Sequence, residues 1–256
     1  MDRNELLGRF DLTDRVAIVT GGSRGIGRAV AEGFAAVGAK VVIASRKADA
    51  CDRAVADIEA AGGTALAVPT HVGDLDQLAA LVERTVEAFG GVDIVFNNAA
   101  NALALPYGSI TPEAWQKSFD ANLRAPVFLV QQALPHLRKS DHAAVVNVIT
   151  AGAFTQGGFM AIYVAAKTAL LSVTRSMAHE FAGDGIRVNA LAPGTTDTDM
   201  VRNTTPEMQK VMVAGQLIDR MARADEMAPA ALFLASDAAS FMTGHVLVVD
   251  GGLTVN

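Results

Sequence analysis

Seven short apolar runs, separated by stretches of helical pattern, constrain the fold of this chain more than any other feature. The runs are rich in Val, Ile and Ala, and they are apolar at odd and even positions alike. Strands without a polar face are typical of a parallel sheet that helices cover on both sides. The predicted strands are Val16–Thr20, Val41–Ala44, Ala65–Val68, Val92–Asn97, Ala143–Ile149, Arg187–Leu191 and Val246–Val249.

The stretches between these runs predict helices. Glycines follow several of them at the position of a helix C-cap, and Thr111-Pro112 is typical of a helix N-terminus. The predicted helices are Ile26–Val37, Leu75–Phe89, one that begins at Pro112, Ile162–Phe181 and Pro229–Ala235. Strands that alternate with helices predict an α/β fold with a doubly wound parallel sheet of the Rossmann type.

No linker of biased composition interrupts the pattern, so residues 1–256 are expected to form a single domain. Residues 195–222 depart from it, because this stretch is polar, carries four methionines and follows the turn Pro193-Gly194. Methionine side chains adapt to surfaces of different shape. The segment is therefore expected to be a substrate lid.

Charge and cysteine content exclude several classes of function. The net charge is −6, whereas a nucleic-acid-binding surface is basic, so no nucleic-acid partner is expected. The single cysteine, Cys51, cannot form an intrachain disulfide, and the histidines lack metal-ligand spacing, so no metal is expected. The charged N-terminus does not resemble a signal peptide, and no apolar run reaches the about 20 residues needed to span a bilayer. These features predict a soluble, cytoplasmic protein.

A glycine-rich turn joins the first predicted strand to the first predicted helix. It reads Gly21-Gly22-Ser23-Arg24-Gly25-Ile26-Gly27, with glycines at G-x-x-x-G-x-G spacing. Backbone N–H groups at such a turn can approach a pyrophosphate at the positive end of a helix. A flexible turn that needs positive φ is the alternative, but the position between strand and helix favours a dinucleotide site.

The end of the second predicted strand indicates which dinucleotide binds. NAD enzymes of the Rossmann type carry an acidic residue there, which binds the ribose 2′-hydroxyl. This chain has Ser45-Arg46 instead, and Arg24 in the glycine turn adds a second cation. Guanidinium groups suit a phosphate. The pattern predicts NADP(H) rather than NAD(H), although both arginines could also be solvated surface residues.

Tyr163 and Lys167 lie four residues apart in a predicted helix, so they share one face. A free tyrosine has a pKa of about 10, and lowering it to about 7 takes about 4 kcal/mol of preferential phenolate stabilisation. A nearby ammonium and a positive nicotinamide ring are possible sources. Such a phenol could exchange a proton with an alcohol or carbonyl oxygen. By itself, however, the spacing also fits an exposed amphipathic helix.

Several motifs in one order resemble the short-chain dehydrogenase/reductase family, over nearly the whole chain. The matching segments are TGGSRGIG at 20–27, NNAA at 97–100, Asn122 in NLRAP, YVAAK at 163–167, RVNALAPG at 187–194 and FMTGHVLVVDGG at 241–252. The resemblance implies an NADP(H)-dependent oxidoreductase that moves a hydride between the nicotinamide ring and an alcohol or carbonyl carbon.

The resemblance also implies residue roles. Tyr163 would be the acid/base, Lys167 would bind the nicotinamide ribose and lower the pKa of the tyrosine, and Asn122 would hold a water of a proton relay. Thr150 would stand where the family usually has a serine that orients the substrate oxygen. Thr198 would contact the nicotinamide carboxamide. The expected cofactor contacts are Gly21, Ser23, Arg24, Gly25, Ile26, Gly27, Ser45, Arg46, Val72, Asn98, Ala99, Ala100, Tyr163, Lys167, Pro193, Gly194, Thr196 and Thr198.

The chain departs from the family pattern at three positions. The serine has become Thr150, whose extra methyl restricts χ1. The glycine of NNAG has become Ala100, whose methyl is expected to crowd the backbone near the cofactor. The aspartate that usually meets the adenine has become His71, which leaves only Val72 as the expected contact there.

Other readings stay open. A cofactor-binding sensor or scaffold without turnover is the alternative to an enzyme, and a reductase of 3-oxoacyl thioesters is a substrate variant. Asn101, Phe154 and Gln156 are expected to help set an otherwise unidentified small-molecule substrate. Small residues along Ile162–Phe181 permit close helix pairing, and the resemblance implies a homotetramer built from two dimers.

Overall fold

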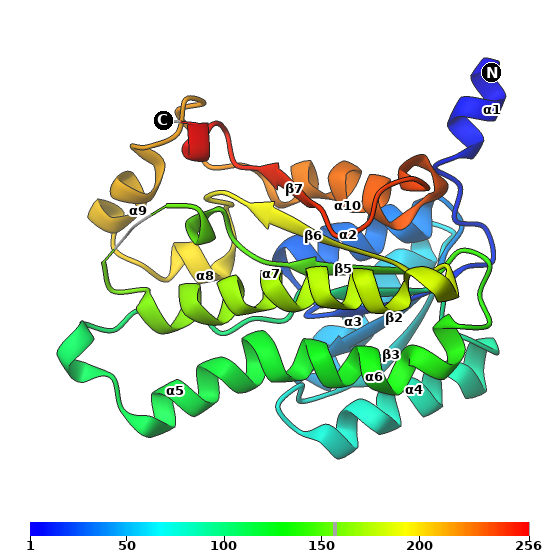
Figure 1. Ribbon diagram of the computed structural model, residues 1–256, viewed down its shortest axis with the longest axis horizontal. Helices are drawn as coiled ribbons and strands as arrows, with labels where there is room; N and C mark the ends of the chain where they lie inside the picture. The colour runs from blue at the N-terminus through cyan, green and yellow to red at the C-terminus, as the bar shows by residue number, and fades with distance from the viewer. Residues whose placement is uncertain (156–157, 256) are drawn as a thin grey trace.

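The computed structural model describes residues 1–155 and 158–255. Its strands form one seven-stranded sheet of order β3-β2-β1-β4-β5-β6-β7, and every neighbouring pair is parallel (Figure 1). This architecture confirms the predicted fold class. The strands are β1 (Val16–Thr20), β2 (Lys40–Ser45), β3 (Thr64–Pro69), β4 (Ile94–Asn97), β5 (Ala144–Val148), β6 (Arg187–Pro193) and β7 (Val246–Val249).

Helices cover both sides of this sheet. Phe34 of α2, Cys51 of α3 and Leu234 of α10 belong to the core cluster on one face, and Leu81 of α4 and Leu129 of α6 belong to that on the other. The α-helices are α1 (Arg3–Gly8), α2 (Gly25–Ala36), α3 (Ala48–Ala60), α4 (Leu75–Phe89), α5 (Pro112–Phe119), α6 (Ala125–Leu137), α7 (Ala161–Phe181), α8 (Asp199–Arg202), α9 (Pro206–Val213) and α10 (Ala228–Ala235).

The side-chain alternation of β1 explains why its sequence has no polar face. Ala17 and Val19 pack into the cluster with α2, and Ile18 packs into the cluster with α4 and α6. All three side chains are fully buried. A strand in this position needs apolar residues at successive positions, because both sides of the sheet are dry.

The strand order creates a crevice at one edge of the sheet. The chain leaves β1 toward α2 on one face, and it leaves β4, the neighbour of β1, toward α5 and α6 on the other. The two connections diverge at the carboxyl ends of these strands. In doubly wound sheets, ligands bind in the crevice at this point.

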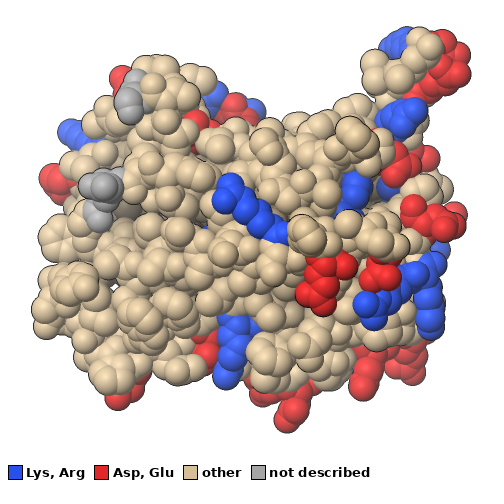
Figure 2. Space-filling model, viewed as in Figure 1, with Lys and Arg blue, Asp and Glu red and all other residues tan. Residues whose placement is uncertain are grey.

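The strand at one end of the sheet departs from the expected full coverage. Val248 of β7 is 37% exposed, and the other residues of this strand are only half-buried, because β7 has a neighbour on one side only. In Figure 2, charged side chains are sparse over the middle of the face that shows α6 and α7, and they gather toward its rim. Among the described residues, no helix is long and apolar enough to cross a membrane.

Candidate active site

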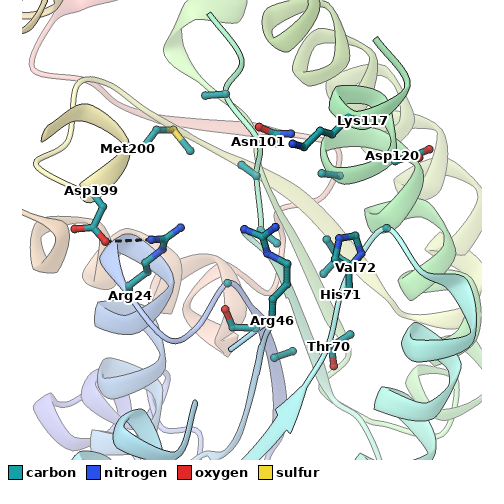
Figure 3. A pocket seen from close by; sticks show the side chains of 18 of the residues that line it. Arg24, Arg46, Thr70, His71, Val72, Asn101, Lys117, Asp120, Asp199 and Met200 are labelled. Carbon is teal, nitrogen blue, oxygen red and sulfur yellow. Dashed lines mark hydrogen bonds and ion pairs between the residues drawn. The ribbon is translucent and has the colours of Figure 1, made fainter. Parts of the chain in front are cut away.

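A cleft of about 900 Å³ opens at the carboxyl ends of the strands (Figure 3). Its wall combines the glycine turn, the end of β2, the loop after β3, the residues after β4, the start of α5 and the start of α8. Of the predicted cofactor contacts, the residues that line it are Gly21, Arg24, Ser45, Arg46, Val72, Ala99 and Ala100. The cleft therefore unites segments that are up to about 180 residues apart in the chain.

The glycine turn leaves no room for side chains. Gly21 and Gly25 have φ values of +68° and +55°, a region that favours glycine. A Cβ on Gly27 would overlap the Gly21 carbonyl and the Asn98 amide. This compact turn runs directly into α2, whose first N–H groups are positioned to bind an anion. Ile26 packs against the core rather than lining the cleft.

The Thr20 side chain fixes the segment after β4 against this turn. Its Oγ1 accepts hydrogen bonds from the N–H groups of Asn98 and Ala99, both at 3.0 Å. The Asn98 Nδ2 donates in turn to the Thr20 carbonyl at 2.9 Å. Ala100 then follows with an exposed side chain and without a positive φ. The expected crowding by its methyl group is therefore wrong for this backbone.

The two predicted arginines have different surroundings. Arg46 lines the cleft and makes no ion pair or hydrogen bond in the described part of the chain, so its guanidinium can take an anionic ligand. Arg24 instead pairs with Asp199, with 3.2 Å between Nη1 and Oδ2. Ser45, next to Arg46, accepts a hydrogen bond from Ser23 Oγ at 2.9 Å. His71 and Val72 lie near Arg46 on the cleft wall (Figure 3).

Asn122 lies in one turn of π-helix, η2 (Asp120–Arg124), between α5 and α6. Such turns are common at functional sites because they redirect a side chain. Asn122 is fully buried, and its amide exchanges hydrogen bonds with the backbone of Asn101, accepting from its N–H at 3.1 Å and donating to its carbonyl at 2.8 Å. The bonds tie η2 to the loop that lines the cleft, so Asn122 holds Asn101 in place.

Tyr163 and Lys167 share one face of α7, as predicted from their spacing. The Tyr163 hydroxyl is hydrogen-bonded to Thr150, which follows β5. Burial raises the Tyr163 pKa to about 12, and the Thr150 hydrogen bond lowers it only partly. Burial and Thr150 are the causes that act on this pKa in the chain alone, so the lowering of the Tyr163 pKa by Lys167 stays a prediction.

The buried Lys167 ammonium donates to the Val148 carbonyl of β5 at 2.7 Å. Lys167 is 1% exposed, and burial lowers its pKa to about 7. A buried hydrogen-bond network joins β5 to α7. Asn97 of β4 donates to Asn147 of β5, and Asn147 donates to Thr174 of α7, both at 2.9 Å. This network was not predicted from the sequence, although asparagines in apolar strands need hydrogen-bond partners when they are buried and could have indicated it.

This burial predicts that stability depends on pH. The Lys167 pKa is about 7 in the folded chain, against 10.5 for a free lysine side chain, so the unfolded chain binds more protons between these values. The free energy of unfolding should therefore rise by about 2 kcal/mol from pH 7 to pH 9. Above pH 9, the raised pKa of the Cys51 thiol, caused by burial, begins to act in the opposite direction. Urea unfolding across this range measures the slope.

Lys167→Met should abolish this slope, whereas Lys139→Met, which removes an exposed ammonium, should preserve it. A slope that survives in Lys167→Met would show that another group causes the pH dependence.

The predicted contacts Pro193, Gly194, Thr196 and Thr198 lie at the end of β6 and just after it, and none of them lines the cleft. Gly194 packs against Asp250, and a Cβ there would lie 2.6 Å from the Asp250 Cα. Thr196 Oγ1 donates to the Gly194 carbonyl at 3.1 Å, and Thr196 also forms an isolated β-bridge with Ala222. A Cβ on Gly25 would lie 3.1 Å from the Thr198 Cγ2, so this segment packs against the glycine turn. Pro193, which ends β6, is buried.

The segment 195–222 contains α8 and α9, and its two ends are joined by the Thr196–Ala222 bridge. Met200 and Asn101 lie along the same part of the cleft (Figure 3). Phe154 is 46% exposed, and Gln156 lies outside the described residues. Within residues 1–155 and 158–255, no group of three or more His, Cys, Asp or Glu side chains is placed to hold a metal ion.

A family model described as enoyl-(acyl carrier protein) reductase matches residues 21–254. The chain is 42% identical to cis-4-hydroxycyclohexanecarboxylate dehydrogenase of Sinomonas cyclohexanicum, over 94% of this chain and 97% of that protein. It is 38% identical to an L-rhamnose 1-dehydrogenase (NAD(P)(+)) of Azotobacter vinelandii, over 96% and 98%.

Solved structures of similar sequence share the fold. A proposed NAD(P)-dependent gluconate 5-dehydrogenase of Beutenbergia cavernae, solved with NADP bound at low occupancy, superposes with a TM-score of 0.91. It is 35% identical, and the match covers 97% of this chain and all of that one. A short-chain type dehydrogenase/reductase of Mycobacterium marinum superposes with a TM-score of 0.92 at 30% identity, over 98% of this chain and all of that one.

Proposed function

The chain belongs to the short-chain dehydrogenase/reductase family and is a hydride-transferring oxidoreductase, and from this premise we propose that it uses NADP(H) and that Tyr163 is its acid/base. The observation that carries the proposal is the grouping of Tyr163, Thr150 and Lys167 at the carboxyl end of β5. This group lies beyond the same sheet edge as the cleft, as the hydride acceptor or donor requires.

The glycine turn and Arg46 fit a phosphorylated dinucleotide. The absence of side chains at the glycines of the turn lets a ligand approach its backbone closely. Arg46 is a cation without an anionic partner in the described chain. Gly21, Gly25 and the first N–H groups of α2 would hold the pyrophosphate, and Ser45 with Arg46 would hold a 2′-phosphate. When bound, the nicotinamide supplies or accepts the hydride.

The chain's own residues would handle the proton. During carbonyl reduction, the Tyr163 hydroxyl would donate its proton to the substrate oxygen, and during alcohol oxidation the phenolate would take it back. The Thr150 hydroxyl, already bonded to Tyr163, would orient the same oxygen. Because burial holds the Tyr163 pKa near 12, proton exchange near neutral pH needs a positive charge beside the phenol. The Lys167 ammonium and the oxidised nicotinamide are the two candidates.

The cofactor proposal predicts a selective effect of Arg46→Ala. A hydrogen bond to a charged group contributes about 1.5–3 kcal/mol, so the Kd for NADPH should rise about 10-fold to 100-fold. The Kd for NADH, which lacks the 2′-phosphate, should change less than about twofold. Titration of the reduced cofactor's fluorescence measures both constants. Lys47→Ala is the matched control, because Lys47 is the next exposed cation and does not line the cleft. Equal weakening of both cofactors by Arg46→Ala would contradict the assignment.

The substrate is proposed to be a small secondary alcohol or its ketone. The names of two relatives give a hydroxycyclohexanecarboxylate and the sugar L-rhamnose as their substrates. The name of one structural neighbour gives gluconate. Lys117 lines the cleft near Asn101 and has no ion-pair partner in the described chain, which suits a substrate carboxylate (Figure 3). Segment 195–222 is proposed as the lid over this substrate. The description of the matching family model favours an acyl thioester as the second candidate.

Assembly and location complete the proposal. Exposed small residues follow one face of α7 at Ala165, Thr168, Ser172 and Ser176, which permits close approach of a second copy. Together with the half-exposed β7, this supports a homotetramer built from two dimers. The proposed location is the cytoplasm.

A substrate screen tests the proposed function. Purified protein is mixed with NADPH or NADP⁺ and with cyclohexanols, sugar acids, their ketones and short acyl thioesters, while absorbance of the reduced nicotinamide is followed. Turnover of at least one alcohol or ketone is expected. Tight cofactor binding with no turnover of any compound would favour the alternative of a sensor or scaffold.

A further inference from the structure

Arg24 and Asp199 form an ion pair at one side of the cleft (Figure 3). Arg24 is the residue before α2, and Asp199 is the first residue of α8, so the ion pair joins the glycine turn to the proposed lid. Both residues line the cleft, and their side chains are 68% and 52% exposed. The pair is therefore open to competition from a dissolved or bound anion.

The backbone on either side of this pair is already in contact. The Thr198 side chain, one residue before Asp199, lies against Gly25, one residue after Arg24. Asp199 thus stays beside the phosphate-binding turn because of packing as well as charge. A ligand phosphate that reaches Arg24 also meets a carboxylate close by.

The two arginines of the cleft consequently differ in their readiness for a 2′-phosphate. Arg46 makes no ion pair within the described residues, whereas Arg24 donates to the Asp199 carboxylate. A phosphate dianion would gain less from a guanidinium that is already paired, and it would be repelled by the carboxylate. A ribose with a free 2′-hydroxyl carries no charge and would be far less sensitive to either effect.

We propose that Asp199 determines cofactor specificity, because it competes with the 2′-phosphate for Arg24 and so weakens NADP(H) relative to NAD(H). The inference rests on the proposed function, namely that a nicotinamide dinucleotide binds in this cleft. Arg46 favours the phosphorylated cofactor and Asp199 opposes it, so the ratio of the two affinities depends on both residues.

Asp199→Asn tests the proposal by cofactor binding alone. The Kd for NADPH, measured by fluorescence titration at low salt, should fall about threefold to tenfold, as expected when a charge near a partly exposed phosphate is removed. The Kd for NADH should change less than twofold. Raising the salt concentration to about 1 M should remove most of the difference, because charge interactions are then screened within about 3 Å.

Asp197→Asn is the matched control. Asp197 also lies in the proposed lid and also pairs with an arginine, Arg202, at 2.6 Å, but it does not line the cleft. The same loss of charge there should leave the NADPH to NADH ratio unchanged. In an Arg24→Gln background, Asp199→Asn should lose most of its effect on NADPH, because the competition for Arg24 no longer exists.

The outcomes separate the two proposals. Equal effects of Asp199→Asn on both cofactors, no effect on either, or the same shift in Asp197→Asn would overturn the role of Asp199. If the unmodified protein binds neither NADPH nor NADH, the proposed function fails first, and the role of Asp199 fails with it. Thermal unfolding confirms that each variant is folded, which the exposure of both aspartates leads us to expect.

Discussion

Tyr163→Phe is expected to lower kcat by a factor of about 10²–10⁴, because it removes the proposed general acid and keeps the ring. Within the described residues, Thr150 is the hydrogen-bond partner of the phenol hydroxyl. Loss of this hydrogen bond should cost about 1 kcal/mol of stability. The Kd of the cofactor should stay within about twofold. Steady-state kinetics on the best substrate of the screen, together with fluorescence titration, measure both quantities.

Tyr107→Phe provides the control for this experiment. Tyr107 is the other of the two tyrosines in the chain and is 84% exposed, so removal of its hydroxyl should leave kcat unchanged. A Tyr163→Phe variant that keeps more than about a tenth of kcat would assign the proton transfer to another group.

The second large effect is expected from Gly27→Ala. A Cβ at this position would overlap the Gly21 carbonyl and the Asn98 amide. Gly21 belongs to the proposed pyrophosphate site, and Asn98 is hydrogen-bonded to Thr20, the residue before Gly21. Backbone there has to move, so cofactor binding should weaken at least about 100-fold, and overpacking should cost about 1–3 kcal/mol of stability. Fluorescence titration measures the Kd of the cofactor, and urea unfolding measures the free energy of unfolding.

Gly33→Ala is the matched control, because it makes the same substitution in the same helix, α2. A Cβ on Gly33 would meet one side-chain atom, the Ala228 Cβ, at 3.3 Å. Alanine is also favoured over glycine in a helix by about 1 kcal/mol, which offsets this tight contact. Cofactor binding should be unaffected. Normal cofactor binding by Gly27→Ala would contradict the assignment of the glycine turn to the cofactor site.

The strands were predictable from the sequence because burial on both faces of the sheet leaves a strong signal. All seven strands of the described structure overlap predicted apolar runs, with bounds that differ by a few residues. Five α-helices of the described structure were not predicted: α1, α3, α6, α8 and α9. Three of these, α1, α8 and α9, have at most eight residues each, and the composition of the other two explains why they were missed. The α3 helix is largely polar on its outer face, and α6 contains Pro126 and Pro135, which are read from sequence as helix breakers.

The site was predictable where neighbours in sequence are also neighbours in space. The spacing of Tyr163 and Lys167 places both on one face of a helix, and the glycine turn lies between a strand and a helix. The pairing of Arg24 with Asp199 joins residues 175 positions apart, so no local pattern could indicate it. The raised Tyr163 pKa likewise follows from burial, which depends on the folded chain.

The strand order also determines when each half of the sheet can form during synthesis. β1, β2 and β3 emerge first and form one half of the sheet, with β2 between the other two. β4 then joins the opposite side of β1, and β5, β6 and β7 add outward in chain order. Each growing edge thus stays unpaired until the ribosome has delivered the next strand, and parallel strands pair slowly. A chain that stops before residue 246 leaves β6 as the edge, and β6 is the longest strand of the described sheet and almost entirely buried. Such shortened chains should aggregate, so β7 protects the nascent protein as well as completing its sheet.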